Sequence, residues 1–308
     1  MKKLLLGLIL LLIAAAAILW FVPATQLASL RLVEQHRAGL THEQVRVHDL
    51  NIHYYQGGPV NGEAIVLIHG FAADKDNWLR FARHLTDRYH VIALDLPGFG
   101  QSDHPTGSYD VGTQAERLAD FLDALKLGST HLLGNSMGGH IAALYAARYP
   151  QRVKTLALFD NAGIKAEHES ELYRRLREGK ANPLVVRQPE DFQQLLDFVF
   201  VEPPYLPQPL KQYLTKRAMD NAPYYDEVFR QLVERYIPLE QELPKITAPT
   251  LLLWGKQDRV LDVSSIEVMK PLLQKPSVAI MEEVGHAPML ERPEQSAQLY
   301  RQFLQTAQ

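Results

Sequence analysis

The 308-residue sequence predicts an α/β fold built on a mostly parallel, doubly wound sheet. Short apolar runs of strand length alternate with helical patterns through most of the chain, as expected where covering helices join parallel strands. A Gly-x-Ser-x-Gly pentapeptide at residues 134–138 marks the junction of one such strand with the next helix. A helical stretch of about 80 residues interrupts the alternation and predicts an insertion between two strands.

The N-terminal segment predicts a membrane anchor. Lys2 and Lys3 precede an uncharged apolar run from Leu4 to Val22, which closes with Trp20 and Phe21. Nineteen helical residues at about 1.5 Å each span roughly 28 Å, close to the thickness of the hydrocarbon core. The apolar region of a cleaved signal peptide has only about 7–15 residues, yet a cleaved signal stays an alternative. The lysines favour a cytoplasmic N-terminus with the body across the membrane.

The segment after this run is expected to continue as a helix, from Ala24 to Leu40. Three interpretations stay open: the helix lies at the headgroup boundary, packs on a second copy, or forms a solvated linker. Small residues at Ala14–Ala17 permit close helix approach, so a homodimer through the anchor is a further hypothesis. Residues 1–39 are therefore assigned to a membrane anchor and juxtamembrane helix. Arg31 and Arg37 weaken the prediction of orientation, because they add positive charge on the far side of the apolar run.

The body is expected to form two parts of one core, residues 40–161 and 245–308. Two alternating runs around Asp49 predict an opening hairpin, Gln44–His48 and Ile52–Tyr55. The later strands are nearly continuous apolar runs, typical of strands buried on both faces: Ala64–His69, Val91–Asp95, His131–Gly134, Leu156–Asp160, Thr250–Trp254 and Val278–Met281. Helical patterns lie between or after them: Asn77–Leu85, Val111–Leu125, Met137–Arg148, Ser264–Leu273 and Glu294–Leu304.

Residues 162–244 carry helical patterns only and predict a cap, or lid, over the carboxyl ends of the strands, where ligands of such sheets bind. The segment is rich in apolar and aromatic residues: Phe192, Leu195, Leu196, Phe198, Val199, Phe200, Tyr205, Leu206, Tyr213, Tyr224 and Tyr225. These residues either line an apolar channel or form the core of an ordinary helical subdomain. A basic cluster, Arg174, Arg175, Arg177 and Lys180, either faces anionic headgroups or belongs to a solvated face with neighbouring glutamates.

Ser136 is the candidate nucleophile. In a tight strand-to-helix turn, side chains two residues before and after the serine would collide with the backbone, and Gly134 and Gly138 remove these collisions. The hydroxyl group is then expected above the sheet, at the positive end of the following helix. The alternative is a loop serine between two packing glycines.

A nucleophilic serine needs a base, and the base needs an orienting carboxylate. His286 follows the last predicted strand and Asp258 follows the preceding one, so both are expected at one edge of the sheet with Ser136. Two other carboxylates are rivals for the acid. Asp160 ends the strand after the serine turn, and Asp262 lies where it would cap the next helix.

Acyl transfer also needs backbone donors for the oxyanion. We expect one donor at Met137 N–H, beside the nucleophile, and the other at Phe71 N–H, where Gly70 lets the chain bend. His69 is expected to be buried and structural. No metal or cofactor is required for this chemistry.

Several motifs together resemble the α/β-hydrolase family: His69-Gly70-Phe71, residues 95–102, the Ser136 pentapeptide, Trp254-Gly255-Lys256-Gln257-Asp258 and Gly285-His286. The order serine, acid, histidine along the chain is also that of the family. The resemblance runs from about Val45 to Leu304. Residues 71–78 and 256–263 are similar to membrane-anchored monoacylglycerol lipases, and with the N-terminal run the whole chain is similar to bacterial membrane-bound phospholipases A.

This resemblance implies hydrolysis of lipid esters, with a phospholipid or acylglycerol as substrate and a fatty acid as product. It also implies contact with membrane lipids through the N-terminal helix, in a bacterial inner membrane with the catalytic body in the periplasm. A net charge of −3 gives no sign of a nucleic-acid partner, and the absence of cysteine excludes disulfide bonds and thiolate metal sites. The alternatives are a carbon–carbon bond (meta-cleavage product) hydrolase or perhydrolase, and a non-catalytic ligand-binding sensor.

Overall fold

The computed structural model describes residue 5, residue 7 and residues 22–307. The predicted anchor falls almost entirely outside these residues, so it stays a prediction. Within the described part of the chain, no helix combines the length and the apolar character needed to cross a bilayer.

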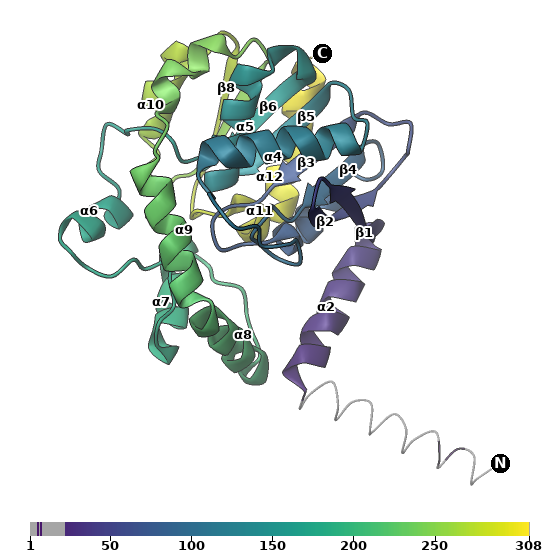
Figure 1. The fold of residues 1–308 in the computed structure, drawn as a ribbon, viewed down its shortest axis with the longest axis vertical. Coiled ribbons are helices and arrows are strands. Elements are labelled where there is room, and N and C mark those ends of the chain that lie inside the picture. Colours follow the sequence, from purple (N-terminus) through teal and green to yellow (C-terminus); the bar gives the residue numbers. More distant parts are fainter. Residues whose placement is uncertain (1–4, 6, 8–21, 308) are drawn as a thin grey trace.

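An eight-stranded sheet forms the centre of the body, in the order β1-β2-β4-β3-β5-β6-β7-β8 (Figure 1). The first two strands form an antiparallel hairpin and β2 pairs antiparallel with β4, whereas all other neighbours are parallel. The predicted α/β fold is therefore confirmed. The strands are β1 (Leu40–Val47), β2 (Leu50–Gly57), β3 (Ala64–Ile68), β4 (His90–Leu94), β5 (Thr130–Asn135), β6 (Val153–Phe159), β7 (Thr250–Gly255) and β8 (Pro276–Met281).

Helices cover both faces of the sheet and bury two apolar cores. Alternate residues of a strand point to opposite faces, and β3 shows this directly, because Val66 joins one core and Leu67 the other. One core contains residues of α4 (Val111–Ala124), α5 (Met137–Arg148) and α10 (Ser265–Met269). The second contains residues of α3 (Leu79–Ala82), α11 (Pro288–Glu291) and α12 (Pro293–Thr306). This double cover leaves the carboxyl ends of the parallel strands free to carry a site.

The insertion between β6 and β7 is helical, as the pattern predicted. It contains α6 (Glu171–Arg177), α7 (Pro189–Val199), α8 (Gln208–Asp220) and α9 (Ala222–Glu234). Two short 3₁₀ helices, Leu239–Gln241 and Leu243–Lys245, lead back to the sheet. Figure 1 shows α6 to α9, in teal to green, extending away from the sheet.

Three predicted helices have other bounds in the structure. The helix expected over Ala24–Leu40 is α2 (Pro23–Arg37), because Gly39 takes a φ of +61° and the chain then enters β1. In place of the helix expected over Asn77–Leu85, a 3₁₀ helix at Lys75–Trp78 precedes the short α3. The helix expected over Ser264–Leu273 ends as α10 at Met269, and a 3₁₀ helix containing Pro271 follows it.

Helix α2 lies against the body although none of its residues is buried. It contacts α8, α3 and β1. Arg31 forms ion pairs with Asp74, in the loop after β3, and with Asp76, in the 3₁₀ helix at Lys75–Trp78. Charge pairing therefore attaches this helix, where a buried apolar face would be usual.

Candidate active site

The backbone at Ser136 is strained and held in place by hydrogen bonds. Ser136 has φ +55° and ψ −122° between β5 and α5, a conformation that costs energy for a residue with a side chain. Its N–H donates to Phe159 O at 3.0 Å, and its carbonyl oxygen accepts from His140 N at 3.1 Å and from Ala162 N at 3.0 Å. Strand β6 and the chain that leaves it thus fix the turn from one side.

The glycines of the pentapeptide are required by close backbone contacts. A Cβ on Gly134 would overlap the carbonyl of Gly138, and a Cβ on Gly138 would overlap the carbonyls of Ile68 and His69. Gly138 therefore leaves room for the end of β3 as well as for the turn itself. This is a further reason for Gly138 that the motif alone does not reveal.

His286 and Asp258 form a buried hydrogen-bonded pair. His286 Nδ1 lies 2.8 Å from Asp258 Oδ2, and each residue is only 7% exposed. Asp258 Oδ1 accepts from Val260 N at 2.7 Å and from Leu261 N at 3.1 Å. Because an ionised carboxylate only accepts hydrogen bonds, Nδ1 carries the proton and Nε2 is left as the basic nitrogen.

Asn135 links this pair to the serine turn. Its side-chain Nδ2 donates to His286 O at 3.0 Å and to Phe159 O at 3.1 Å. The residue directly before Ser136 therefore fixes the loop that carries His286. Sequence reasoning missed this role, and the available signal was an amide at the end of a buried strand, which must find partners.

The two rival carboxylates have separate places. Asp262 Oδ1 accepts from Ser264 N at 2.9 Å ahead of α10, which fits the capping interpretation. Asp160 is fully buried, and its Oδ1 accepts from Gly255 N at 2.8 Å. One oxygen of Asp160, one of Asp258 and a ring nitrogen of His286 lie within 4.8 Å of one another. Asp258, and not Asp160, makes the hydrogen bond to the imidazole ring.

The loop after β3 brings Gly70, the residue before the second expected oxyanion donor, close to Ser136. A Cβ on Gly70 would lie only 3.1 Å from Ser136 Cβ and 3.3 Å from Asn135 Oδ1. Met137, the other expected donor, is the first residue of α5. Among the hydrogen bonds of the described residues, none uses the N–H of Phe71 or of Met137.

His69 stabilises this loop from inside the protein, as expected of a structural histidine. Its Nε2 accepts from Leu96 N at 3.0 Å, so its Nδ1 carries the proton and donates to Gly70 O at 2.8 Å. Burial lowers the pKa of His69, which keeps the ring neutral.

A buried ion pair couples the two loops that carry family motifs. Lys75 Nζ lies 2.6 Å from Asp95 Oδ2 and donates to Gln101 Oε1 at 2.8 Å. Both charged side chains are essentially inaccessible to solvent, at 2% and 0% exposed. The Asp95 carboxylate also accepts from the backbone N–H of Lys75 and of Gln101. The same paired carboxylate therefore fixes the loop with Phe71 and the loop after β4.

Aromatic residues of α9 cover the Phe71 loop. The Phe71 ring makes edge-on contacts with Tyr225 and Phe229, each at a centroid distance of 5.6 Å. Tyr225 also stacks on Phe99 at 6.2 Å, and Tyr224 donates from its hydroxyl to Gly98 O at 2.8 Å. These cap aromatics pack on loops of the core beside the serine turn.

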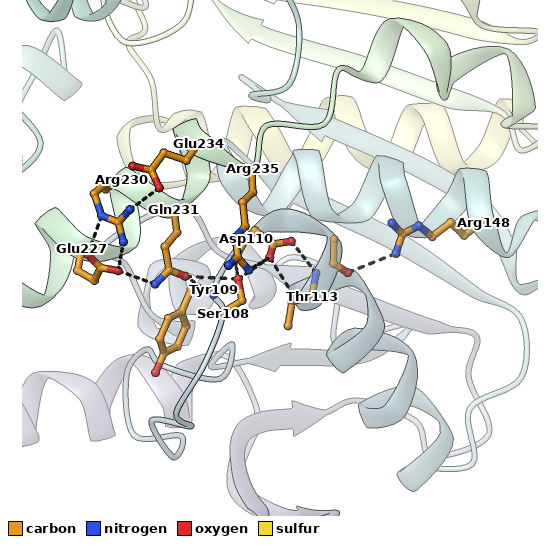
Figure 2. A network of polar contacts seen from close by, with 11 residues as sticks. Ser108, Tyr109, Asp110, Thr113, Arg148, Glu227, Arg230, Gln231, Glu234 and Arg235 are labelled. Carbon is orange, nitrogen blue, oxygen red and sulfur yellow. Dashed lines mark hydrogen bonds and ion pairs between the residues drawn. The ribbon is translucent and has the colours of Figure 1, made fainter.

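A polar network joins α9 to the start of α4 (Figure 2). Gln231 Oε1 accepts from Tyr109 N at 2.7 Å, and Arg235 pairs with Asp110 at 3.5 Å. Asp110 also caps α4 by accepting from Thr113 N at 3.0 Å. The helical insertion is therefore attached to the core through Asp110, the N-terminal capping residue of α4.

A second attachment joins α6 to the loop of Asp258. Arg259 contacts both oxygens of the Glu171 carboxylate, at 2.7 Å from Nε and 3.0 Å from Nη2. Its guanidinium group also lies 4.9 Å from the ring centre of Phe198 in α7. Arg175 pairs with the same Glu171 at 2.7 Å, and Arg177 pairs with Glu169 at 2.8 Å. Arg175 and Arg177 of this helix are thus paired with glutamates, which favours the solvated-face interpretation for these two residues.

Comparison with known proteins places this geometry in a family. Residues 63–293 match the family model described as alpha/beta hydrolase fold. Lipase 1 of Psychrobacter immobilis is 38% identical over 257 residues, covering 81% of this chain and 79% of the relative. Monoacylglycerol lipase ABHD6 of Homo sapiens is 32% identical over 262 residues, covering 81% of this chain and 77% of the relative.

A solved structure is similar to this chain over its whole length. The crystal structure of a membrane phospholipase A, described as a bacterial virulence factor, superposes with a TM-score of 0.92. It is 63% identical and covers 100% of this chain and 99% of the other. The chain belongs to the α/β-hydrolase family.

Proposed function

We propose that this protein is a serine hydrolase that cleaves the carboxylic ester bonds of phospholipids or acylglycerols. The observation that carries the proposal is the buried His286–Asp258 pair. Asn135, the residue before the strained turn of Ser136, holds the loop of His286 by a hydrogen bond. The named activities of the relatives, lipase, monoacylglycerol lipase and phospholipase A, support the lipid ester as substrate.

The proposed reaction has two stages. Ser136 Oγ attacks the ester carbonyl carbon while His286 Nε2 takes its proton, and Asp258 stabilises the imidazolium that forms. The N–H groups of Phe71 and Met137 donate to the oxyanion. His286 then gives its proton to the leaving alcohol, and the acyl group stays on Ser136. Water, deprotonated by His286, attacks the acyl-enzyme; His286 then returns this proton to Ser136 Oγ as the fatty acid is released.

The contacts around the turn support an apolar acyl chain as ligand. Phe71 lies against Tyr225 and Phe229 of α9, so the expected oxyanion donor is flanked by aromatic rings. Apolar walls both accommodate acyl chains and strengthen the hydrogen bonds to a developing oxyanion, because they exclude water. The reaction needs no metal or cofactor.

The division of the chain is part of the proposal. Residues 1–39 act as a single-pass anchor and juxtamembrane helix, residues 40–161 and 245–308 as the hydrolase core, and residues 162–244 as the lid. The anchor holds the body on the periplasmic side of a bacterial inner membrane, with the N-terminus in the cytoplasm. The similarity to a membrane phospholipase A over the whole chain supports membrane attachment. A homodimer formed through the anchor belongs to the same proposal.

Ser136→Ala tests the nucleophile. The variant is expected to lose more than about 10³-fold in kcat for p-nitrophenyl ester hydrolysis, since triad members act as a unit. Intact-mass analysis should find one fluorophosphonate adduct on the wild type, at Ser136, and none on the variant. Ser277→Ala, at an exposed serine of β8, is the matched control and should behave as wild type.

Two results would contradict the proposal. Hydrolysis of a dienone acid without any ester turnover would indicate a carbon–carbon bond hydrolase. Tight binding of an acyl ligand without turnover, and without an adduct at Ser136, would indicate a sensor.

A further inference from the structure

Asp160 is a buried carboxyl group for which the proposed reaction has no use. It follows β6 with φ +45°, a strained conformation for a residue with a side chain. Its N–H donates to Leu253 O at 3.0 Å, and its Oδ1 accepts from Gly255 N at 2.8 Å. Backbone and one carboxyl oxygen are thus both fixed at the end of β7, the strand that leads into the loop of Asp258.

The second oxygen of Asp160 has no donor. Oδ2 is buried without a hydrogen-bond partner among the described residues if the group is ionised. A buried carboxylate oxygen without a donor is costly. The carboxyl group of Asp160 has an acceptor group close by, because one of its oxygens, one oxygen of Asp258 and a ring nitrogen of His286 lie within 4.8 Å of one another. A proton on Oδ2 would turn the unpaired oxygen into a donor.

The number of donors decides which of the two carboxyls holds the proton. Asp258 accepts three hydrogen bonds, from Val260 N, Leu261 N and His286 Nδ1. Asp160 accepts one, from Gly255 N. Hydrogen bonds to a carboxylate stabilise its charged form, so the negative charge resides on Asp258. Two carboxylates this close in a dry site do not both ionise at neutral pH.

The groups around Asp160 also favour its protonated form. Burial, and then the charge of Asp258, raise the pKa of Asp160 well above its ordinary value, and Glu291 of α11 adds to this. Glu291 itself is held by Gly285 N at 2.8 Å and by Val201 N at 3.0 Å. His286 is the basic group that faces this cluster, and its proton already bonds to Asp258.

We propose that Asp160 is a positioning residue of the site: a neutral carboxylic acid whose Oδ2–H donates to the carboxylate of Asp258. The two carboxyls then share one negative charge and one proton, and this hydrogen bond holds Asp258 in its orientation toward His286. This inference rests on the proposed function, in which His286 is the base.

The test compares kcat and KM over pH 5–9 for p-nitrophenyl ester hydrolysis by full-length wild type, Asp160→Asn and Asp160→Ala. A carboxamide is neutral, accepts from Gly255 N with its oxygen and donates to Asp258 with its nitrogen. Asp160→Asn is therefore expected to keep kcat within about threefold and the acid limb of kcat/KM within about 0.3 pH unit. Asp160→Ala is expected to lose at least about tenfold in kcat, with KM changed little, because Asp258 loses its support.

Asp262→Asn is the matched control. It replaces an aspartate by an asparagine near the site, but at a residue that makes no hydrogen bond to Asp160 or Asp258, so the pH profile of kcat/KM should stay unaltered. Two outcomes would overturn the proposal. If Asp160 is ionised, Asp160→Asn removes a negative charge beside His286, and the acid limb moves to lower pH by about one unit or more. If Asp160→Ala keeps the wild-type kcat and profile, Asp160 positions nothing.

A measurement on the wild type keeps the proposal testable if the variants fail to fold. With aspartate labelled with ¹³C at Cγ, NMR is expected to show one carboxyl resonance at the shift of a protonated acid from pH 5 to pH 8. Carboxylate shifts for every aspartate at pH 7 would overturn the proposal. This readout does not depend on turnover, so failure of the proposed function, seen with Ser136→Ala, is distinguished from failure of the proton assignment.

Discussion

At the scale of single residues, the site is fixed by buried polar side chains that are not themselves expected to react. His69 fixes the loop of Gly70, Asn135 fixes the loop of His286, and Asp160 fixes the end of β7 that leads to Asp258. Such groups are costly to bury unless every hydrogen bond is made. Their combined effect is to orient the proposed nucleophile and base before substrate arrives, which is where much of the rate enhancement of such sites originates.

Asn135→Leu tests this orientation. The change keeps the side-chain size roughly constant but removes the hydrogen bonds to His286 O and Phe159 O, which lie 3.0 and 3.1 Å from Nδ2. We expect kcat to fall by about 10- to 100-fold, because a small displacement of the base is sufficient for such a loss, with a modest change in KM. Asn221→Leu, at a half-buried asparagine between α8 and α9, is the control, and an unchanged kcat in Asn135→Leu would refute the role.

The candidate nucleophile, base and acid leave a signal in the sequence, whereas the residues that support them do not. The glycines around Ser136 are local and leave a readable pattern, and Asp258 and His286 follow predicted strands. Asn135 occupies a position of the pentapeptide that the motif leaves free, and its acceptor His286 O is 151 residues further along the chain. The relation of Asp160 to Asp258 depends in the same way on which strands are neighbours, because β6 and β7 lie side by side only after the sheet has formed.

At the scale of elements, loops at the carboxyl ends of the strands are held by ion pairs and by the cap. The buried pair Lys75–Asp95 explains why the predicted helix over Asn77–Leu85 was wrong in its bounds. Lys75 is drawn inward to Asp95, and Asp74 caps a 3₁₀ turn by accepting from Asp76 N at 2.9 Å. A long-range contact thus overrides the local helical pattern, as tertiary context commonly does.

Gly70→Ala tests how closely the Phe71 loop must approach the serine. The added Cβ would meet Ser136 Cβ at 3.1 Å, so the loop must shift by a few tenths of an ångström. We expect kcat to fall by about tenfold or more, because the donor at Phe71 moves away from the oxyanion position, while the thermal stability changes little. Gly128→Ala is a matched control, since a Cβ there meets nothing within 4 Å; equal activity of the two variants would contradict the assigned loop role.

Glu171→Gln tests the attachment of the cap to the Asp258 loop. Hydrogen bonds from Arg259, and then Arg175, lower the pKa of Glu171 to about 2. Its folded pKa lies below the unfolded value, so its contribution to stability is complete above about pH 4.5 and is lost as the pH falls toward 2. At pH 7 we expect the variant to lose about 1 kcal/mol of unfolding free energy, a figure discounted because Arg259 is 44% exposed.

Urea unfolding at pH 7 and at pH 3 measures this contribution. The difference between wild type and Glu171→Gln is expected to be smaller at pH 3 than at pH 7. Glu116→Gln is the control, because its pair with Arg148 spans 3.5 Å and its side chain is 67% exposed; it should have no effect. A stability difference between wild type and Glu171→Gln that is the same at both pH values would contradict the proposed attachment of α6 to the Asp258 loop.

At the scale of the whole molecule, the helix that follows the predicted anchor is tied to the candidate active site. Arg31 of α2 pairs with Asp74 and Asp76, which follow Phe71 in the connection between β3 and α3. A body held in this way on a membrane anchor would present its catalytic loop at a fixed orientation to the bilayer. The alternation of strands and helices predicted the sheet and the helical insertion, but not how the cap helices are arranged, because their contacts to the core are long-range and leave no local pattern.

The most direct test of the account is fatty acid release by purified full-length protein. Phospholipid vesicles, monoacylglycerol and short p-nitrophenyl esters serve as substrates, with Ser136→Ala as the blank. We expect the wild type to release fatty acid from at least one of the two lipid substrates and the variant to release none. Fatty acid release by Ser136→Ala at the wild-type rate, or turnover of neither lipid by the wild type, would contradict this expectation.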